Sequence, residues 1–170
     1  SATLNLGKLW LKNRGEVGAL VGLLKHSPLN EAQELQTWCT PLYFSIAHGV
    51  VNCKRMDTLI GSSLQVASWG RVDLPQNKVR MTLAIGAPSL RKLLGIQDIP
   101  NSYSLLLPVR GPVNDPYVDS KQATLAIAAL LARKEGAAGK IFGGVLDLVS
   151  GNLLKQKDIP PPTTQPFPWD

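Results

Sequence analysis

The chain has 170 residues, of which 44% are hydrophobic and 18% are charged. This composition is sufficient for one domain with a hydrophobic core and excludes a largely disordered chain. The 18 Lys and Arg residues exceed the 12 Asp and Glu residues, so the net charge is +6. The basic residues form no run of five, which argues against a nucleic-acid-binding tail and leaves either an anionic partner or a mildly basic surface. The sequence contains no uninterrupted apolar run of about 18 residues, so no transmembrane helix is predicted within it.

The first 37 residues predict one strand and two helices. The start at Ser1 lacks the pattern of a signal peptide and fits either a piece of a longer protein or a processed N-terminus. Residues 3–11, "TLNLGKLWL", alternate as in a strand. A helix is expected over Glu16–Lys25, because its apolar residues recur three and four positions apart. A second, shorter helix is expected over Glu31–Thr37.

Two strands are expected next, on either side of a turn at His48-Gly49. The first strand begins at Thr40 and carries apolar residues at alternate positions. The second covers Val50–Ile60, and its irregular pattern is typical of a strand with a bulge. Gly61 and the two serines after it end this strand.

The clearest alternation follows, in two strands over Ser63–Leu74 and Val79–Gly86. Each strand has one apolar face and one charged or polar face, and Pro75–Asn77 forms the turn between them. This pattern is typical of an antiparallel sheet that is covered on one side only. A short helix over Ala87–Leu94 and another apolar strand over 103–110 are expected next.

The last third of the chain predicts helices and an extended tail. Asp119 or Ser120 is the expected N-cap of a region rich in Ala and Leu. The glycines of this region predict a break near Glu135–Gly139 and therefore two helices. Residues 158–170 are Pro-rich and are expected to be extended. These elements together predict a single α+β domain over residues 1–157, in which a curved antiparallel sheet has helices packed on one face.

The cysteines and histidines do not form a recognisable metal or redox site. Cys39 and Cys53 are about five positions out of register if the strands around His48 pair, which places them about 16 Å apart along a strand. This separation is too large for a disulfide, so two free, half-buried thiols are expected. His26 and His48 have no Cys, Asp or Glu at metal-ligand spacing. We therefore expect no metal and no cofactor.

The sequence contains no catalytic constellation. Its Ser, His and Asp residues lack the context that activates a nucleophile, and its glycines lack the spacing of a phosphate loop. Asp115 and Asp119, on either side of Pro116, are expected to act in a turn and as a helix cap. Trp69 lies on the polar face of its strand, where it either anchors an interface or packs against an overlying segment. We therefore expect that the protein is not an enzyme.

The apolar faces of strands 64–74 and 79–86 allow two interpretations. In the first, the helices over 120–149 cover these faces and complete an ordinary core. In the second, part of the apolar face is open as a groove for acyl chains or for another copy of the sheet. The sequence favours the first interpretation.

Two stretches of sequence carry a resemblance to a known family. They are "TPLYFSIAHGVVNCKRMDTLIGSSLQVASWGRVDLPQNKVRMTLAIG" and "LLLPVRGPVNDPYVDSKQATLAIAALLA". The second is similar to the ending "lPl-x-G-t-l-x-dP-x-vd-x-x-x-A" of AsmA-like proteins of diderm bacteria. Residues 40–134, a little over half of the chain, thus resemble the C-terminal region of the AsmA-like family.

The resemblance implies a long β-groove protein, anchored in the inner membrane by a segment outside this chain. It also implies a periplasmic location and a role in outer-membrane biogenesis and phospholipid transport, without catalytic residues. The implied partners are a phospholipid or another acyl lipid, together with membrane or envelope proteins. Nucleic acid is not an expected partner.

The groove of this family is lined by alternate apolar residues. The corresponding positions in this chain are Val66, Val72, Leu74, Val79, Met81, Leu83, Ile85, Leu105 and Leu107. Arg71, Arg80 and Arg110 are expected as basic residues at the rim, beside lipid headgroups. For Arg110 the alternative is an exposed rim residue without a ligand.

A second hypothesis belongs to a different class of function. The chain would be a structural or interaction module of a larger envelope assembly. Its Pro-rich tail over 158–170, which ends in "PFPWD", would then bind a protein partner.

Overall fold

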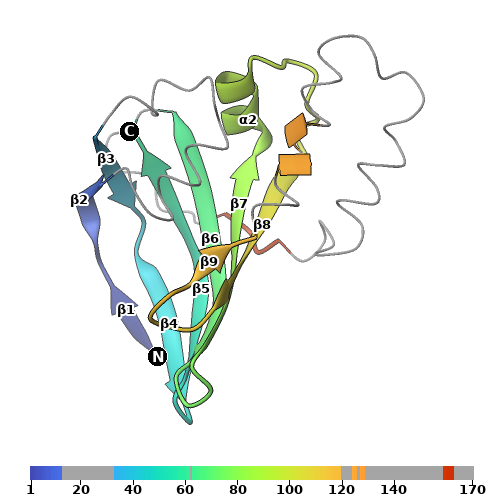
Figure 1. Cartoon of the computed structure of the whole chain (residues 1–170). Helices are drawn as coiled ribbons and strands as arrows, with labels where there is room; N and C mark the ends of the chain where they lie inside the picture. Colours follow the sequence, from blue (N-terminus) through green and yellow to red (C-terminus); the bar gives the residue numbers. More distant parts are fainter. Residues whose placement is uncertain (13–32, 62, 120–123, 126, 129–158, 163–170) are drawn as a thin grey trace.

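The structure is a computed structural model that describes residues 1–12, 33–61, 63–119, 124–125, 127–128 and 159–162 (Figure 1). In this part of the chain the strands form one open antiparallel sheet, which confirms the antiparallel sheet predicted from the sequence. The helix expected over Glu16–Lys25, most of the region expected to be helical after Asp119 and most of the tail over 158–170 lie outside the described residues.

The described residues form a sheet of nine strands in which every pair is antiparallel. Its main order is β1-β4-β5-β6-β7-β8-β9, and β3 pairs with both β2 and β5. The bounds are β1 Ala2–Leu4, β2 Gly7–Lys12, β3 Glu34–Cys39, β4 Leu42–Ala47, β5 Val50–Ile60, β6 Leu64–Asp73, β7 Lys78–Gly86, β8 Ser104–Gly111 and β9 Tyr117–Val118.

Strand β5 joins the two halves of the sheet. Its first residues pair with β4, and its end at Thr58–Ile60 pairs with β3. It also pairs with β6, and the register of this ladder shifts between Cys53 and Met56. The shift confirms the bulge that the irregular sequence pattern predicted. A bulge bends its strand and increases the local twist, and the sheet in Figure 1 is correspondingly curved.

The helix predicted over Glu31–Thr37 is wrong, because Glu34–Cys39 form strand β3. Leu35, Thr37 and Cys39 are buried, whereas the residues between them are partly exposed. The Glu, Ala, Gln and Leu residues of this segment favour a helix by propensity. Pairing with β2 on one side and β5 on the other outweighs that preference.

The strand predicted over residues 3–11 is present but interrupted. Asn5 and Leu6 separate β1 from β2, and Gly7 follows with a φ of 58°. This break lies opposite the break between β3 and β4 at Thr40–Pro41, because β1 pairs with β4 and β2 pairs with β3. Proline cannot donate a ladder hydrogen bond, so the two strands are interrupted where the ladder is already weakened.

The strands and turns between residues 42 and 111 otherwise follow the sequence prediction. Strand β9 was not predicted, because two residues are too few to produce a periodic pattern. His48 and Gly49 form the predicted turn between β4 and β5, with φ angles of 51° and 75°. Positive φ at both central residues is typical of the type I′ turn that joins two strands most tightly.

Helix α2, Ala87–Leu94, begins and ends as the sequence predicts. Pro88 lies in its first turn, where the missing N–H has no cost. Gly95 ends the helix in the left-handed conformation, and its N–H donates to the carbonyl oxygen of Arg91. Leu90, on the buried side of the helix, is fully excluded from solvent.

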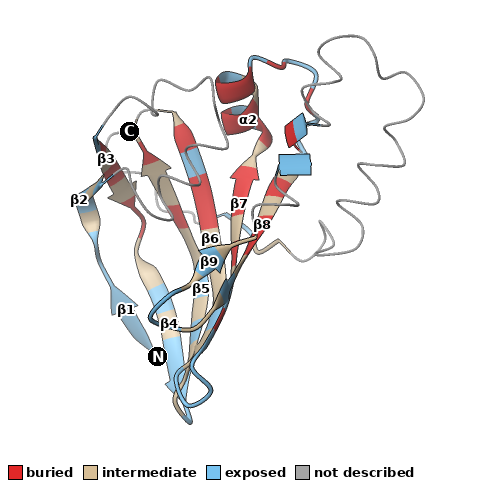
Figure 2. Cartoon of the chain, viewed as in Figure 1, coloured by how far each residue is buried: buried red, intermediate tan, exposed pale blue. Residues whose placement is uncertain are grey.

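The core lies between α2 and one face of the sheet. It contains residues of β3, β5, β6, β7, β8 and α2, and Ile127 from the helical residues after the sheet also belongs to it. Figure 2 shows that buried residues concentrate at the α2 end of the sheet, whereas the opposite end carries more exposed residues. One face of the sheet therefore has a covered half next to α2 and a more exposed half toward the hairpin turns.

Candidate functional site

The register of the strands places the apolar residues of β4–β9 on one face, which we call the apolar face. Residues directly opposite each other in an antiparallel ladder share a face. Val66 pairs with Ile85, and Ile85 pairs with Leu105, so these three residues lie side by side. In the described strands from β4 to β9, no charged residue occupies a paired position on this face.

The half of the apolar face next to α2 is closed. Val66, Ile85, Leu105 and Leu107 are between 0% and 4% exposed and belong to the core. These four residues were predicted to line a lipid groove, and the structure places them in the core. Their burial agrees with the interpretation of this half as an ordinary core, but most of the helices over 120–149 that were predicted to cover it lie outside the described residues.

The other half of the apolar face is partly exposed, and we call its residues the hairpin-side apolar residues. They are Phe44, Val51, Cys53, Met56, Val72, Met81, Leu83 and Val109. Three of them, Val72, Met81 and Leu83, were predicted to contact lipid. Val79 lies among them but is only 8% exposed, and Leu74 lies beyond β6 in the turn with 53% of its surface exposed.

The predicted basic residues lie on the opposite face of the sheet. Arg71 pairs with Arg80, and Arg80 pairs with Arg110, so the three form one row across β6, β7 and β8. Asn52 continues this row on β5 and Tyr117 continues it on β9. We had expected the arginines to form a rim around the apolar face. They lie on the opposite face instead.

This arginine row has an electrostatic cost. All three side chains are exposed, and no hydrogen bond or ion pair joins any of them to another described residue. Like charges placed directly opposite each other destabilise a sheet by a few tenths to about 1 kcal/mol per pair. The neighbouring pair is complementary, because Asp73 lies opposite Lys78. A bound anion would offset the repulsion within the row.

An open hollow of about 920 Å³ lies at the ends of β7 and β8 near the arginine row. Lys78, Arg80, Arg110 and Tyr117 are among the residues that line it. The sequence named two of these arginines, but the alignment of all three depends on strand register and has no local sequence signal. Lys78 was missed for the same reason.

A buried ion pair holds the start of the tail against the sheet. Asp57 is 1% exposed, and the Nη2 of Arg55 lies 2.8 Å from its Oδ1. The Nη1 of Arg55 donates to the carbonyl oxygen of Pro160 at 2.6 Å. The hydroxyl of Thr40 accepts from the backbone N–H of Asp57 at 2.9 Å. These contacts link β5, Thr40 and Pro160, which fits a structural role for the pair.

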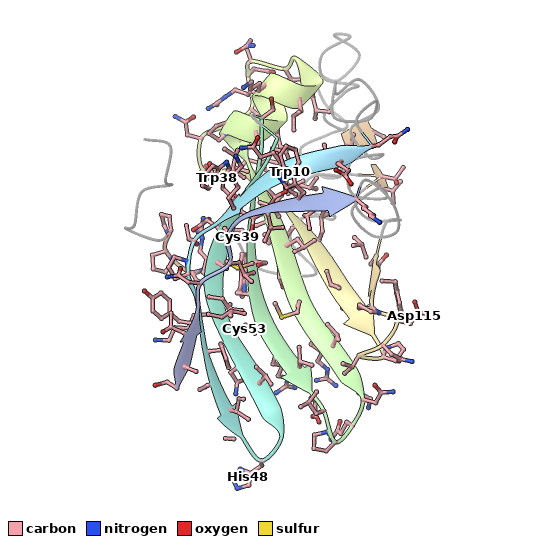
Figure 3. All side chains as sticks on the ribbon, turned by 90° about the vertical axis from the view of Figure 1, so that its left-hand side faces the viewer. Trp10, Trp38, Cys39, His48, Cys53 and Asp115 are labelled. Carbon is pink, nitrogen blue, oxygen red and sulfur yellow. The ribbon has the colours of Figure 1, made fainter. Side chains whose placement is uncertain are left out.

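The tryptophans are distributed between an edge and the interior of the sheet. Trp10 on β2 is 61% exposed. The Nζ of Lys8 lies 5.9 Å from the centre of the Trp10 ring and 5.2 Å from that of Trp38, which is within the range of a cation–π contact. Trp69 is partly buried on the polar face, opposite Thr82. Figure 3 shows Trp10 and Trp38 close together at the β2–β3 edge.

The structure agrees with the ordinary roles predicted for Cys53, His48 and Asp115, whereas Cys39 is buried and not half-buried as predicted. Cys39 and Cys53 are free, and burial raises the pKa of both thiols, which makes them poor nucleophiles. They lie well apart along the sheet in Figure 3. His48 is exposed at its turn, and the N–H of Asp115 closes a turn onto the carbonyl oxygen of Pro112. His26 lies outside the described residues.

Two further observations concern the part of the chain that the structure describes. It contains no group of three or more His, Cys, Asp or Glu residues arranged to bind a metal ion. No helix in it combines the length and the hydrophobicity needed to cross a membrane.

Comparison of the chain with protein families, with curated proteins and with solved structures found no match. The resemblance to AsmA-like proteins therefore stays a prediction made from the two sequence stretches.

Proposed function

We propose that the chain is a non-enzymatic, AsmA-like module that binds phospholipid or another acyl lipid through the hairpin-side apolar residues. The observation that carries this proposal is a partly exposed stretch of the sheet face, from β4 to β8, with only uncharged residues at its paired positions. Contiguous exposed apolar patches on soluble proteins often mark binding sites. An acyl chain is complementary to this stretch because it offers apolar contact and makes no demand for hydrogen bonds.

Burial of an acyl chain would supply a large favourable free energy. Each methylene group removed from water contributes about 0.8 kcal/mol. About ten methylenes then supply the free energy of a micromolar complex, before the cost of association is subtracted. Met81 suits such a site, because its flexible, polarisable side chain adapts to different chain positions.

The covered half of the sheet would give this site a closed end. Here α2 and Ile127 contact the core, and we propose that helices over 120–149 complete this cover. An acyl chain would then lie over the hairpin half and stop at the core. In the biological setting that the resemblance implies, the module would act in the periplasm, attached to the inner membrane, during outer-membrane biogenesis.

The test is lipid binding by the full chain and by one pair of variants. Met81→Asp places a charge among the hairpin-side apolar residues, and Gln65→Asp places the same charge on the exposed, polar face as a matched control. We expect native mass spectrometry to recover lipid from the wild type and from Gln65→Asp, but not from Met81→Asp.

The design separates loss of binding from loss of folding. Val72→Thr replaces one methyl group with a hydroxyl and keeps the shape of the side chain. It serves as the second variant if Met81→Asp does not fold, and we expect it to fold and to bind lipid more weakly than the wild type. Absence of lipid from the wild type, combined with no binding of a fluorescent phospholipid, would refute the proposal. Equal binding by Met81→Asp and the wild type would refute it as well.

A second candidate function is protein binding by the tail. It is favoured by one observation: Pro160 is anchored to Arg55, whereas Pro161 and Pro162 are exposed. The anchor would fix the point from which a Pro-rich segment is offered to a partner. Deletion of residues 163–170 should then abolish pull-down of an envelope protein and leave lipid binding unchanged. If the deletion left the pull-down unchanged, protein binding by the tail would be refuted and only the lipid proposal would stay.

A further inference from the structure

The turns at the end of the sheet away from α2 are hydrogen-bonded to one another. The N–H of Leu74 donates to the carbonyl oxygen of Gly49 at 3.1 Å. The N–H of Val113 donates to the Oδ1 of Asn77 at 3.0 Å. The β4–β5 turn, the β6–β7 turn and the loop after β8 therefore form one surface, which we call the turn end. In Figure 3, His48 marks its tip.

The turn end exposes large apolar side chains. Ile46 is 61% exposed, Leu74 and Tyr117 are each 53% exposed, and Val113 is 36% exposed. Single exposed apolar residues are common on soluble proteins. Here four of them surround three linked turns, and one is a tyrosine, whose ring suits the boundary between an apolar and an aqueous phase.

The same end of the sheet is basic. Its exposed cations are Arg71, Lys78, Arg80 and Arg110. Its acidic residues are Asp73 and Asp115. The Oδ1 of Asp73 already accepts from the N–H of Gln76 at 2.9 Å, and its side chain lies opposite Lys78. Asp73 is the acidic residue nearest to the row, two positions from Arg71 on the same face, and the row itself contains three arginines and no carboxylate.

We infer that the turn end is a docking surface for an anionic phospholipid bilayer. Leu74 and Val113 enter the boundary between headgroups and acyl chains, and the Tyr117 ring lies at headgroup level. The arginine row, a few strand spacings wide, contacts lipid phosphates, which offset the repulsion between its guanidinium groups. A soluble phosphate would explain the charges but not the apolar turns.

This surface goes beyond the proposed acyl-chain site and does not depend on it. The variants that test the two sites use different residues: Met81 and Val72 lie on the apolar face, whereas Leu74 lies in a turn and Arg80 lies on the polar face. Of the turn-end residues, Ile46 borders the apolar face, because it pairs with Val51. Bilayer docking and lipid extraction can therefore fail independently.

The experiment is flotation of the full chain with vesicles. Vesicles of phosphatidylcholine with phosphatidylglycerol should carry the protein upward, and pure phosphatidylcholine vesicles should not. Binding should weaken as salt is added, because exposed charges are screened. Arg80→Gln should lower vesicle affinity about fivefold, the effect of one basic residue at an anionic surface. Lys12→Gln, an equal loss of charge at the far end of β2, should leave it unchanged.

A second pair of variants tests the apolar turns. Leu74→Asp should abolish flotation, whereas Leu6→Asp, at the exposed connection of β1 and β2, should not. Circular dichroism checks folding, and the exposed positions make unfolding unexpected. Equal flotation with both vesicle types overturns the inference, as does an equal effect of Arg80→Gln and Lys12→Gln. Competition by millimolar inorganic phosphate would also overturn it, because it indicates a soluble-anion site.

Discussion

Gly70 shows how a single residue determines the course of β6. Its φ is 139°, a conformation that residues with a side chain rarely adopt. A Cβ atom at this position would lie 2.4 Å from the carbonyl oxygen of Arg80 and 2.8 Å from the Cα of Met81. Gly70 also pairs with Cys53, next to the bulge in β5. Strands β6 and β7 can therefore approach closely here only because this residue has no side chain.

Replacement of this glycine should destabilise the protein strongly. Gly70→Ala is expected to lower the free energy of unfolding by at least about 2 kcal/mol, because backbone atoms must move to make room. Gly86→Ala is the matched control, since its Cβ would meet only the Cδ of Pro88 at 3.7 Å and its φ is not positive. A loss of no more than about 1 kcal/mol is expected for the control, because Gly86 is the N-cap of α2 and Ala is a poorer N-cap than Gly.

Chemical denaturation of both variants measures these differences. Similar losses for Gly70→Ala and Gly86→Ala would show that the close approach of the strands is not what makes Gly70 necessary.

At the residue scale, the sequence predicts which face of the sheet a residue lies on but not which residues lie opposite it on the adjacent strands. Alternation assigned Val72 and Met81 to the apolar face and Arg71 to the polar face, and the register agrees with both assignments. It did not predict that Arg71, Arg80 and Arg110 form one row, because such a row depends on which residues lie opposite each other across strands far apart in sequence. A one-residue slip between β6 and β7 would have removed it.

Helix α2 shows the same contrast at the scale of an element. Its bounds follow from local signals, Pro88 in the first turn and Gly95 at the end. Its stability follows from tertiary packing, because an isolated helix of eight residues is too short to form in water. The buried side of α2 therefore decides whether the covered half of the sheet stays covered.

Truncation of a buried α2 side chain should test this role. Leu90→Ala is expected to lower the free energy of unfolding by about 3 kcal/mol, because it removes buried surface and leaves a cavity. Leu74→Ala, at a side chain that is 53% exposed, should change it by less than about 0.5 kcal/mol. Thermal or urea unfolding measures both. A small effect of Leu90→Ala would mean that α2 is not part of the cooperative core.

The elements that sequence reasoning missed share one physical cause. Strand β3 contains helix-forming residues, and only its two ladders make it a strand. Strand β9 exists because Tyr117 and Val118 meet the end of β8. In contrast, β6 and β7 alternate clearly enough to be identified without their partners. Strands with a strong local pattern were predicted, and strands that depend on distant pairing were not.

At the scale of the whole molecule, the sheet separates an apolar from a polar face. Burial in this arrangement raises the pKa of the Cys39 thiol above its usual value of 9.0 and that of the Tyr103 hydroxyl above 10.0. Both groups therefore stay protonated up to a higher pH in the folded state than in the unfolded state. Their contribution to stability is complete below the unfolded-state pKa and is lost as the pH rises through the folded-state pKa.

The free energy of unfolding should accordingly fall in alkaline solution. Denaturation at about pH 8 and about pH 10.5 is expected to give a lower value at the higher pH. Tyr103→Phe removes one of the responsible hydroxyls and should reduce this fall. Tyr117→Phe removes a hydroxyl from an exposed ring and should not. An equal fall in both variants would show that the Tyr103 hydroxyl does not contribute to it.

The position of β5 has a consequence for the order of folding. β5, β6 and β7 are consecutive in sequence and joined by short turns, so their pairing closes only small loops. β3 and β4 both pair with β5, and β2 and β1 attach only to β3 and β4. Strands β1–β4 therefore have no ladder to join in the main sheet until β5 is in place. We expect the sheet to grow outward from β5–β7, with the β1–β2 edge as the last part to assemble and the first to separate.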